Sequence, residues 1–147
     1  AVVGSTALGS YAPLAIAATG FPAIAYRNIA NQSLDFARCS TYDCATGSTT
    51  TRIVDDGGNV GVHASLVVAP DGVPFMAYQD AGGNDLRSAK CGSLNCDQPT
   101  LGTLDIVGNV GEYAAAAIGS DGLPLIAYYD ATNGDLKLVR CGTRACL

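Results

Sequence analysis

The sequence predicts an all-β protein built from three similar units of about 50 residues each. Residues 120–146, SDGLPLIAYYDATNGDLKLVRCGTRAC, nearly repeat residues 70–96, PDGVPFMAYQDAGGNDLRSAKCGSLNC. Of the 13 acidic residues only Glu112 is a Glu, and Asp favours turns and caps where Glu favours helices. Hydrophobic residues make up 48% of the chain and charged residues 14%, which favours a folded core over disorder.

Cysteines set the register of the repeat. The first cysteine of each pair recurs after 52 and then 50 residues, and the second cysteine keeps the same separations. Other residues recur in the same register: Gly20, Gly72 and Gly122; Pro22, Pro74 and Pro124; Tyr26, Tyr78 and Tyr128; Leu34, Leu86 and Leu136; Arg38, Lys90 and Arg140. We therefore divide the single domain 1–147 into units of about 1–53, 54–103 and 104–147.

Each unit has the pattern of four consecutive strands. In the second unit we expect strands over residues 62–70, 73–80, 86–91 and 100–107, separated by turns rich in Gly, Asp and Asn. Residues 112–120, EYAAAAIGS, are rich in Ala, which favours helix. Their counterparts, 11–19 and 63–71, contain Pro or β-branched residues, so we predict a strand in all three units.

The strands are apolar on both faces, as in LPLIAYY of residues 123–129. Four-stranded sheets that stack face to face around an axis explain this pattern, with the small Ala-rich first strand innermost, and this is the β-propeller arrangement. A β-solenoid is the alternative, although its coils are usually shorter.

The pattern DGxPxIAYYDxxNGDLKxxxCxxxxC resembles the blade repeats of secreted bacterial β-propeller proteins, most closely over residues 54–147. The resemblance implies the fold and an extracellular setting, but no single activity. The first unit departs from it at the acidic positions: Thr19 replaces Asp71 and Asp121, Asn28 replaces Asp80 and Asp130, and Ser33 replaces Asp85 and Asp135. No catalytic residue is therefore transferred from the family.

The two ends of the chain predict self-association. The third unit ends at Leu147 before a fourth strand, while residues 1–3 align with the end of a fourth strand. Closed propellers have about four to eight blades, and an unpaired sheet edge invites another strand. We expect the amino-terminal segment of one copy to complete the last sheet of the next, giving a six-bladed ring or an open filament. The residues predicted to make this contact are Ala1, Val2, Val3, Leu136, Leu138 and Arg140.

A second interpretation is that the chain is a piece of a longer propeller. The chain starts at Ala1 without Met, which is expected of a processed mature form or of an excised fragment.

Each C-x₄-C pair is expected to form a local disulfide at the end of a third strand, which indicates an oxidising, extracellular compartment. The predicted pairs are Cys39–Cys44, Cys91–Cys96 and Cys141–Cys146. A zinc site would require two pairs to converge, and free thiols are the third alternative. We predict no metal and no cofactor.

The candidate ligand-binding residues are acids beside turns and repeated tyrosines. They are Tyr26, Tyr78, Tyr128, Tyr129, Asp80 and Asp130. The tyrosines either fill the space between sheets or bind glycans. The acids either tighten turns, bind calcium or serve glycoside hydrolysis. His63, the only histidine, occupies a Tyr position of the repeat, so we expect it to pack rather than to catalyse.

Net charge and hydropathy exclude two classes of partner. A formal charge of −5 argues against nucleic acid and anionic membranes, and no apolar run is long enough to cross a bilayer. We predict a secreted, non-enzymatic module that self-associates in a structural or scaffold role, with its own copies as partner. A carbohydrate-binding module is the alternative, followed by a hydrolase that acts on polysaccharide.

Overall fold

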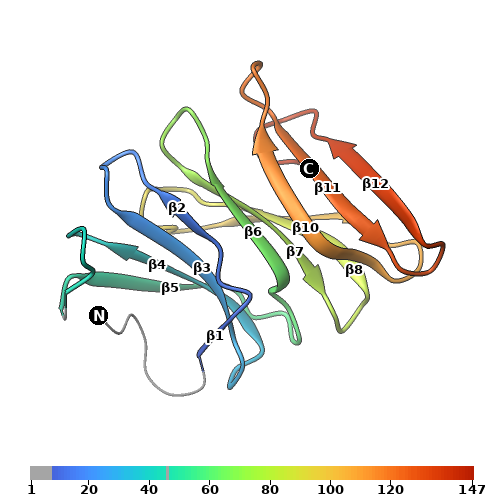
Figure 1. Cartoon of the computed structure of the whole chain (residues 1–147), viewed down its shortest axis with the longest axis horizontal. Helices are drawn as coiled ribbons and strands as arrows, with labels where there is room; N and C mark the ends of the chain where they lie inside the picture. The colour runs from blue at the N-terminus through green and yellow to red at the C-terminus, as the bar shows by residue number, and fades with distance from the viewer. Residues whose placement is uncertain (1–7, 46) are drawn as a thin grey trace.

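The computed structural model describes residues 8–45 and 47–147. This part of the chain contains twelve β-strands in three antiparallel sheets and no helix, which confirms the all-β prediction (Figure 1). No described segment is therefore a helix able to span a membrane.

In the second and third sheets the strands follow one another in chain order, so each is a meander, and in the first sheet β1 and β2 both pair with β3. The first sheet contains β1 (Leu8–Ser10), β2 (Leu14–Ile16), β3 (Pro22–Asn28), β4 (Ser33–Cys39) and β5 (Thr49–Asp55). The second contains β6 (Val62–Val68), β7 (Pro74–Asp80), β8 (Asp85–Lys90) and β9 (Thr100–Asp105). The third contains β10 (Val110–Ile118), β11 (Pro124–Asp130) and β12 (Asp135–Arg140).

The first strand of the first sheet is divided in two. We predicted one strand over residues 11–19, but β1 and β2 are separate and both pair with β3. Tyr11, between them, has a left-handed φ of 49°, and Pro13 has no amide hydrogen to donate. The Pro13 carbonyl still accepts a hydrogen bond from Ala25 N at 3.1 Å, so the chain stays against β3.

The Ala-rich segment of the third unit is a strand, as predicted. Along β10, Ala115, Ala116 and Ala117 pair with successive residues of β11. Its small side chains also let β10 lie close to β6, where Ala116 N donates to Ser65 Oγ at 2.9 Å. In Figure 1, β6 lies between β2 and β10, so the first strands of the three sheets are neighbours.

The sheets pack face to face and share two hydrophobic cores. The first core joins sheets one and two and includes Leu34, Phe36, Leu66, Met76 and Tyr78. The second core joins sheets two and three and includes Phe75, Leu86, Val110, Ile126 and Tyr128. The second sheet is thus covered on both faces, as its apolar strands predicted.

Within the described residues, β12 is paired on one side only, with β11, and is the outer strand of the third sheet. The segment predicted to pair with it in another copy, Ala1, Val2 and Val3, lies outside the described residues.

Candidate functional site

In each unit, six positions lie on one face of two neighbouring strands, which are β3 and β4, β7 and β8, or β11 and β12. Because β1 and β2 are one divided strand, we call these two the second and third full strands of the unit. The six positions form the face that a sheet turns toward the next sheet, and we call them the packing row. In the first unit the row is Ala23, Ala25, Arg27, Leu34, Phe36 and Arg38. In the second it is Phe75, Ala77, Gln79, Leu86, Ser88 and Lys90. In the third it is Leu125, Ala127, Tyr129, Leu136, Leu138 and Arg140.

In the first two units, the next sheet covers the apolar side chains of the packing row. Leu34 and Leu86 both have an exposed fraction of 0%. A side chain on Gly61 would stand 3.1 Å from the Cβ of Leu34, and one on Gly111 would stand 3.3 Å from the Cβ of Leu86. Both glycines have left-handed φ, 82° and 88°, which glycine adopts without strain. A glycine at the start of the following sheet therefore packs directly against each leucine.

The polar members of the row bind the same segment of the following sheet. Arg27 donates to Asn59 Oδ1 at 2.5 Å, and Gln79 donates to Asn109 Oδ1 at 2.8 Å. Gln79 also donates to the Val110 carbonyl at 3.1 Å. The residues that receive a packing row are therefore 59–61 and 109–111, which we call the receiving segment.

A backbone hydrogen bond fixes the same register at both contacts. Val60 N donates to the Gln32 carbonyl at 3.0 Å, and Val110 N donates to the Asn84 carbonyl at 2.9 Å. Gln32 and Asn84 both have left-handed φ, 57° and 62°, in the turn after the second full strand.

In the third unit the packing row is open. Leu136 is 82% exposed and Leu138 is 67% exposed, although their counterparts in the first two units are fully buried. These side chains pair across the strands with Tyr129 and Ala127 on one face of the sheet. Arg140, at the end of the row, pairs with Asp121 of its own unit. An apolar face of this kind on a folded protein marks an interaction surface.

The matching receiving segment of the first unit is residues 7–9, of which Leu8 and Gly9 are described. Gly9 has a left-handed φ of 95° and is exposed, whereas Gly61 and Gly111 are buried. No described atom lies within 4 Å of where a side chain on Gly9 would begin. On the same side of the first sheet, Leu14 is 59% exposed while its counterpart Leu66 is buried in the first core.

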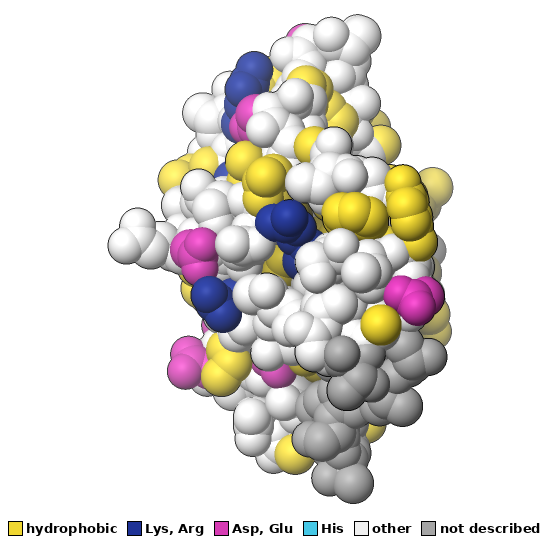
Figure 2. Space-filling view, turned by 90° about the vertical axis from the view of Figure 1, so that its left-hand side faces the viewer, with side chains coloured by type: hydrophobic (Ala, Val, Ile, Leu, Met, Phe, Trp, Pro, Cys, Tyr) yellow, Lys and Arg dark blue, Asp and Glu magenta, His cyan; other side chains and the backbone are white. Residues whose placement is uncertain are grey.

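Figure 2 looks onto the side of the molecule that the first sheet forms. It shows several groups of hydrophobic side chains there, with Lys and Arg side chains between them.

Two of the predicted ligand-binding tyrosines belong to polar clusters between sheets. Tyr78 Oη donates to Asp55 Oδ2 at 2.6 Å, and Arg87 Nη1 lies 3.1 Å from the same oxygen. Arg87 also lies 3.5 Å from Asp80 Oδ2. Burial and the hydrogen bond to Asp55 raise the pKa of Tyr78, which therefore stays a protonated donor.

The cluster recurs between the second and third sheets with Lys137 in the place of Arg87. Tyr128 Oη donates to Asp105 Oδ2 at 2.8 Å, and Lys137 Nζ lies 3.0 Å from both Asp105 and Asp130. Burial, followed by the hydrogen bond to Asp105, raises the pKa of Tyr128 to about 12. Burial alone would raise the pKa of Asp105, but hydrogen bonds from Val107 N, Lys137 and Tyr128 hold it below its ordinary value.

The predicted acids also cap the turns between second and third full strands. Asp80 Oδ1 accepts from Gly82 N at 2.9 Å and Gly83 N at 3.1 Å, and Asp130 Oδ1 accepts from Thr132 N and Asn133 N. The Asn133 side-chain amide and Lys137 hold the pKa of Asp130 at about 2. In the described part of the chain, no three His, Cys, Asp or Glu side chains are grouped as metal ligands.

The first unit replaces the cation of this cluster with Asp35, which is buried. Asn28 Nδ2 donates to Asp35 Oδ2 at 3.0 Å, and Ser33 Oγ donates to Asp35 Oδ1 at 2.6 Å. Burial and the charge of Asp35 raise the pKa of Tyr26. Where the other units have acids, the first unit has Asn28 and Ser33, and where they have the cations Arg87 and Lys137, it has the carboxylate Asp35.

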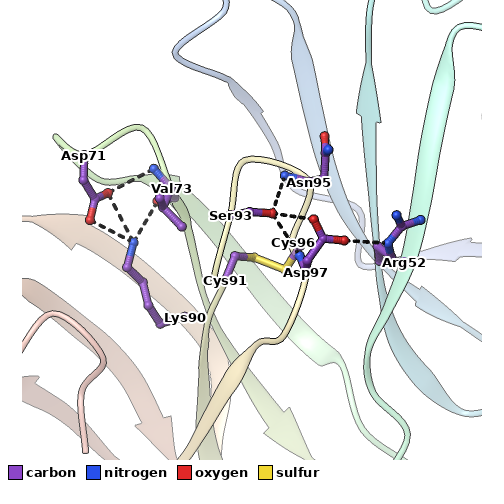
Figure 3. Close-up of a disulfide and its surroundings, with 9 residues drawn as sticks. All are labelled: Arg52, Asp71, Val73, Lys90, Cys91, Ser93, Asn95, Cys96 and Asp97. Carbon is purple, nitrogen blue, oxygen red and sulfur yellow. Dashed lines mark hydrogen bonds and ion pairs between the residues drawn. A yellow bond between two sulfur atoms is a disulfide. The ribbon is translucent and has the colours of Figure 1, made fainter.

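The three disulfides are Cys39–Cys44, Cys91–Cys96 and Cys141–Cys146, the pairs expected from the spacing. The loop that the second disulfide closes packs against the preceding sheet (Figure 3). Arg38 donates to Asn95 Oδ1 at 2.6 Å, and Arg52 of β5 pairs with Asp97 at 3.0 Å. The third loop does the same, since the Cys146 carbonyl accepts from Ser88 Oγ at 3.4 Å.

Ser93 organises the second loop from within. Its Oγ donates to Asp97 Oδ2 at 2.7 Å and accepts from Asn95 N and Asp97 N. Figure 3 shows Asp97 held between Ser93 and Arg52, while Lys90 bonds Asp71 and the Val73 carbonyl on the other side of the disulfide.

One row of aromatic side chains crosses all three sheets at equivalent repeat positions. Tyr11, His63 and Tyr113 have left-handed φ of 49°, 50° and 53°. Ring centroids lie 4.8 Å apart for Tyr11 and His63 and 4.4 Å apart for His63 and Tyr113. Burial lowers the pKa of His63, against a raising effect of Glu112, so the imidazole is neutral at neutral pH. We call these three residues the aromatic row.

The structure places the sequence-predicted residues in different environments. Tyr26, Tyr78 and Tyr128 are buried, so among the four candidate tyrosines Tyr129 has the most exposed ring. Asp55 and Asp105, as well as the receiving glycines, were not among the predicted site residues, although all of them recur in register with the cysteines. Aligning every position of the three units, and not only those identical in all of them, would have found both sets.

No family model matches this chain, and no curated protein matches it either.

Proposed function

We propose that this protein is a secreted module of the β-propeller type that binds copies of itself through the packing row of its third unit. The observation that carries the proposal is the contrast between Leu136 and its counterparts. Leu34 and Leu86 are sealed by the next sheet, whereas Leu136 is 82% exposed. A further sheet of the same repeat is the partner that fits a face with the same shape and chemistry.

The proposed role is structural, as a scaffold or filament subunit outside the cell. Three disulfides support an oxidising compartment. Head-to-tail contacts between copies close into a ring or extend into a filament, depending on the rotation at each contact.

Analytical ultracentrifugation of the 147-residue chain tests this function. We expect the wild-type chain to sediment as a dimer or a larger species and Leu136→Asp to sediment as a monomer, because a carboxylate cannot be buried unpaired in the contact. Ile106→Asp is the matched control, since Ile106 is also exposed but lies outside the packing row. A wild-type chain that stays monomeric at every concentration would refute the proposal.

The aromatic row favours carbohydrate binding as a second candidate function. Three non-glycine residues with left-handed φ at equivalent positions are strained, and such strain concentrates at functional sites. Tyr113 is 70% exposed, and an exposed tyrosine ring with its hydroxyl suits the apolar face and polar edge of a sugar.

An oligosaccharide array tests the second candidate. Binding that Tyr113→Ala abolishes and Tyr42→Ala preserves would support it, because Tyr42 is an exposed tyrosine outside the aromatic row. An array without signal, or equal loss in both variants, would count against it.

A further inference from the structure

We infer the register of the contact between copies: the packing row of the third unit seats on the first sheet of a second copy, with Leu136 of one chain over Gly9 of the other. This inference rests on the proposed self-association and adds its geometry. The interface is then head-to-tail: each chain binds one copy through the packing row of its third unit and another through the receiving segment of its first unit.

The chain already contains this contact twice, between its own units. Leu34 lies under Gly61 and Leu86 lies under Gly111, with the Gly side-chain position 3.1 and 3.3 Å from the leucine Cβ. Leu136 and Gly9 occupy the corresponding positions of the repeat and are the two members that are exposed. The open leucine and the open glycine are thus complementary halves of one contact.

Backbone hydrogen bonds fix the same register at both internal contacts. In both internal contacts the turn after the second full strand presents a left-handed residue whose carbonyl accepts from the receiving segment. Gly134 is the equivalent residue of the third unit, with φ of 75°, and Leu8 is the equivalent of the donors Val60 and Val110. The register therefore places Leu8 N of one copy against the Gly134 carbonyl of the other.

Opposite charges occupy the two sides of the proposed contact at the end of the packing row. Between the first two units, Arg38 donates to Asn95 in the disulfide loop at 2.6 Å. The same repeat positions at the contact between copies hold Arg140 and Asp43, both exposed. Arg140 already pairs with Asp121 of its own unit, so Asp43 of the second copy would be a second carboxylate beside the same guanidinium, where Arg38 has a neutral acceptor.

Complementation between two variants tests this register. In Gly9→Val the side chain would occupy the space of Leu136, while in Leu136→Asp the other half of the contact is removed. Each variant alone should be monomeric. Mixed together, they should form a dimer of one chain of each kind, because the third unit of Gly9→Val and the first unit of Leu136→Asp are intact.

Gly58→Val is the control for backbone strain. Gly58 has a left-handed φ of 90° and open space at its side-chain position, but it lies in the turn between β5 and β6. It should self-associate like the wild-type chain.

The outcomes separate the register from the proposed function. A Gly9→Val chain that self-associates normally, or two monomeric variants that do not combine, would overturn the register and leave self-association standing. A wild-type chain without self-association would overturn both.

If Gly9→Val does not fold, amide hydrogen exchange on the wild-type chain tests the register instead. As protein concentration rises, we expect slower exchange at residues 8–10 and 133–138. Slowing confined to other residues would overturn the register.

Discussion

The same residue type at one repeat position has two different environments in this molecule. Leu34, Leu86 and Leu136 align in the sequence, yet the first two are fully buried and the third is mostly exposed. The sequence predicts that all three lie on third strands facing a neighbour. It does not predict which of them is covered, because burial depends on the sheet that follows.

Truncating each leucine in turn should separate folding from association. We expect Leu34→Ala and Leu86→Ala to lower the free energy of unfolding by about 2–5 kcal/mol, because each leaves a cavity in a packed core. Leu136→Ala should change it by less than about 0.5 kcal/mol in the monomer, as for other exposed positions. Urea unfolding at low protein concentration measures all three. A large loss at Leu136 under these conditions would show that it packs within its own chain.

The ion pair of Asp130 should make stability depend on pH at the acid end. The folded-state pKa of Asp130 is about 2, below the value of about 3.9 expected for an unfolded Asp. The unfolded chain therefore takes up the proton first as pH falls, so this stabilisation is complete above about pH 4 and is lost toward pH 2.

Asp130→Asn tests this dependence because it keeps the shape and removes the charge beside Lys137. The variant should be less stable than the wild-type chain at neutral pH, and the difference should shrink as pH falls from about 4 to about 2. Asp135→Asn, at the exposed end of the same turn, is the control. A difference that stays constant with pH would contradict the role of the ion pair.

The sequence predicts the strands of the second and third units well. Turns rich in Gly, Asp and Asn bound short apolar runs, and the repeat resolves the ambiguity of the Ala-rich strand at Val110–Ile118. The first unit is predicted less well, because Pro13 and the left-handed Tyr11 divide its first strand. The aromatic row was not foreseen as a continuous feature, since contacts between first strands depend on how the sheets pack.

The disulfide loops act as elements of the contacts between sheets. In the chain-entropy model, closing a loop of about six residues stabilises the fold by roughly 2 kcal/mol. The Cys91–Cys96 loop also carries the contacts of Asn95 and Asp97 with the first sheet.

Removing this disulfide should therefore cost more than the entropy term alone. We expect the Cys91→Ser, Cys96→Ser double variant to lose more stability than Cys39→Ser, Cys44→Ser, whose loop has no preceding sheet among the described residues. Thermal unfolding at one low protein concentration compares them. Equal losses would mean that the loop contacts contribute little beyond the loop closure.

The second sheet uses one face as a packing row and the other to receive the row of the first sheet. In the proposed assembly, an open series of copies leaves one packing row and one receiving segment free, and only a closed ring covers both. The repeat in the sequence predicts this polarity through the order of its strands. The residues that meet, such as Leu86 and Gly111, emerge only from the packing of consecutive sheets.

Self-association through these surfaces should make thermal stability depend on protein concentration. A partner that binds the folded chain and not the unfolded chain stabilises it by mass action, by about 2.7 kcal/mol when the partner is present at about 100 times its dissociation constant. The melting temperature of the wild-type chain should therefore rise with concentration, whereas that of Leu136→Asp should stay constant. The contact buries mainly apolar side chains and adds one exposed charge pair, Arg140 with Asp43, so added salt should reduce this rise only slightly, since salt screens charges rather than apolar burial. Differential scanning calorimetry over a dilution series measures both effects, and a melting temperature independent of concentration in the wild-type chain would contradict the mass-action argument.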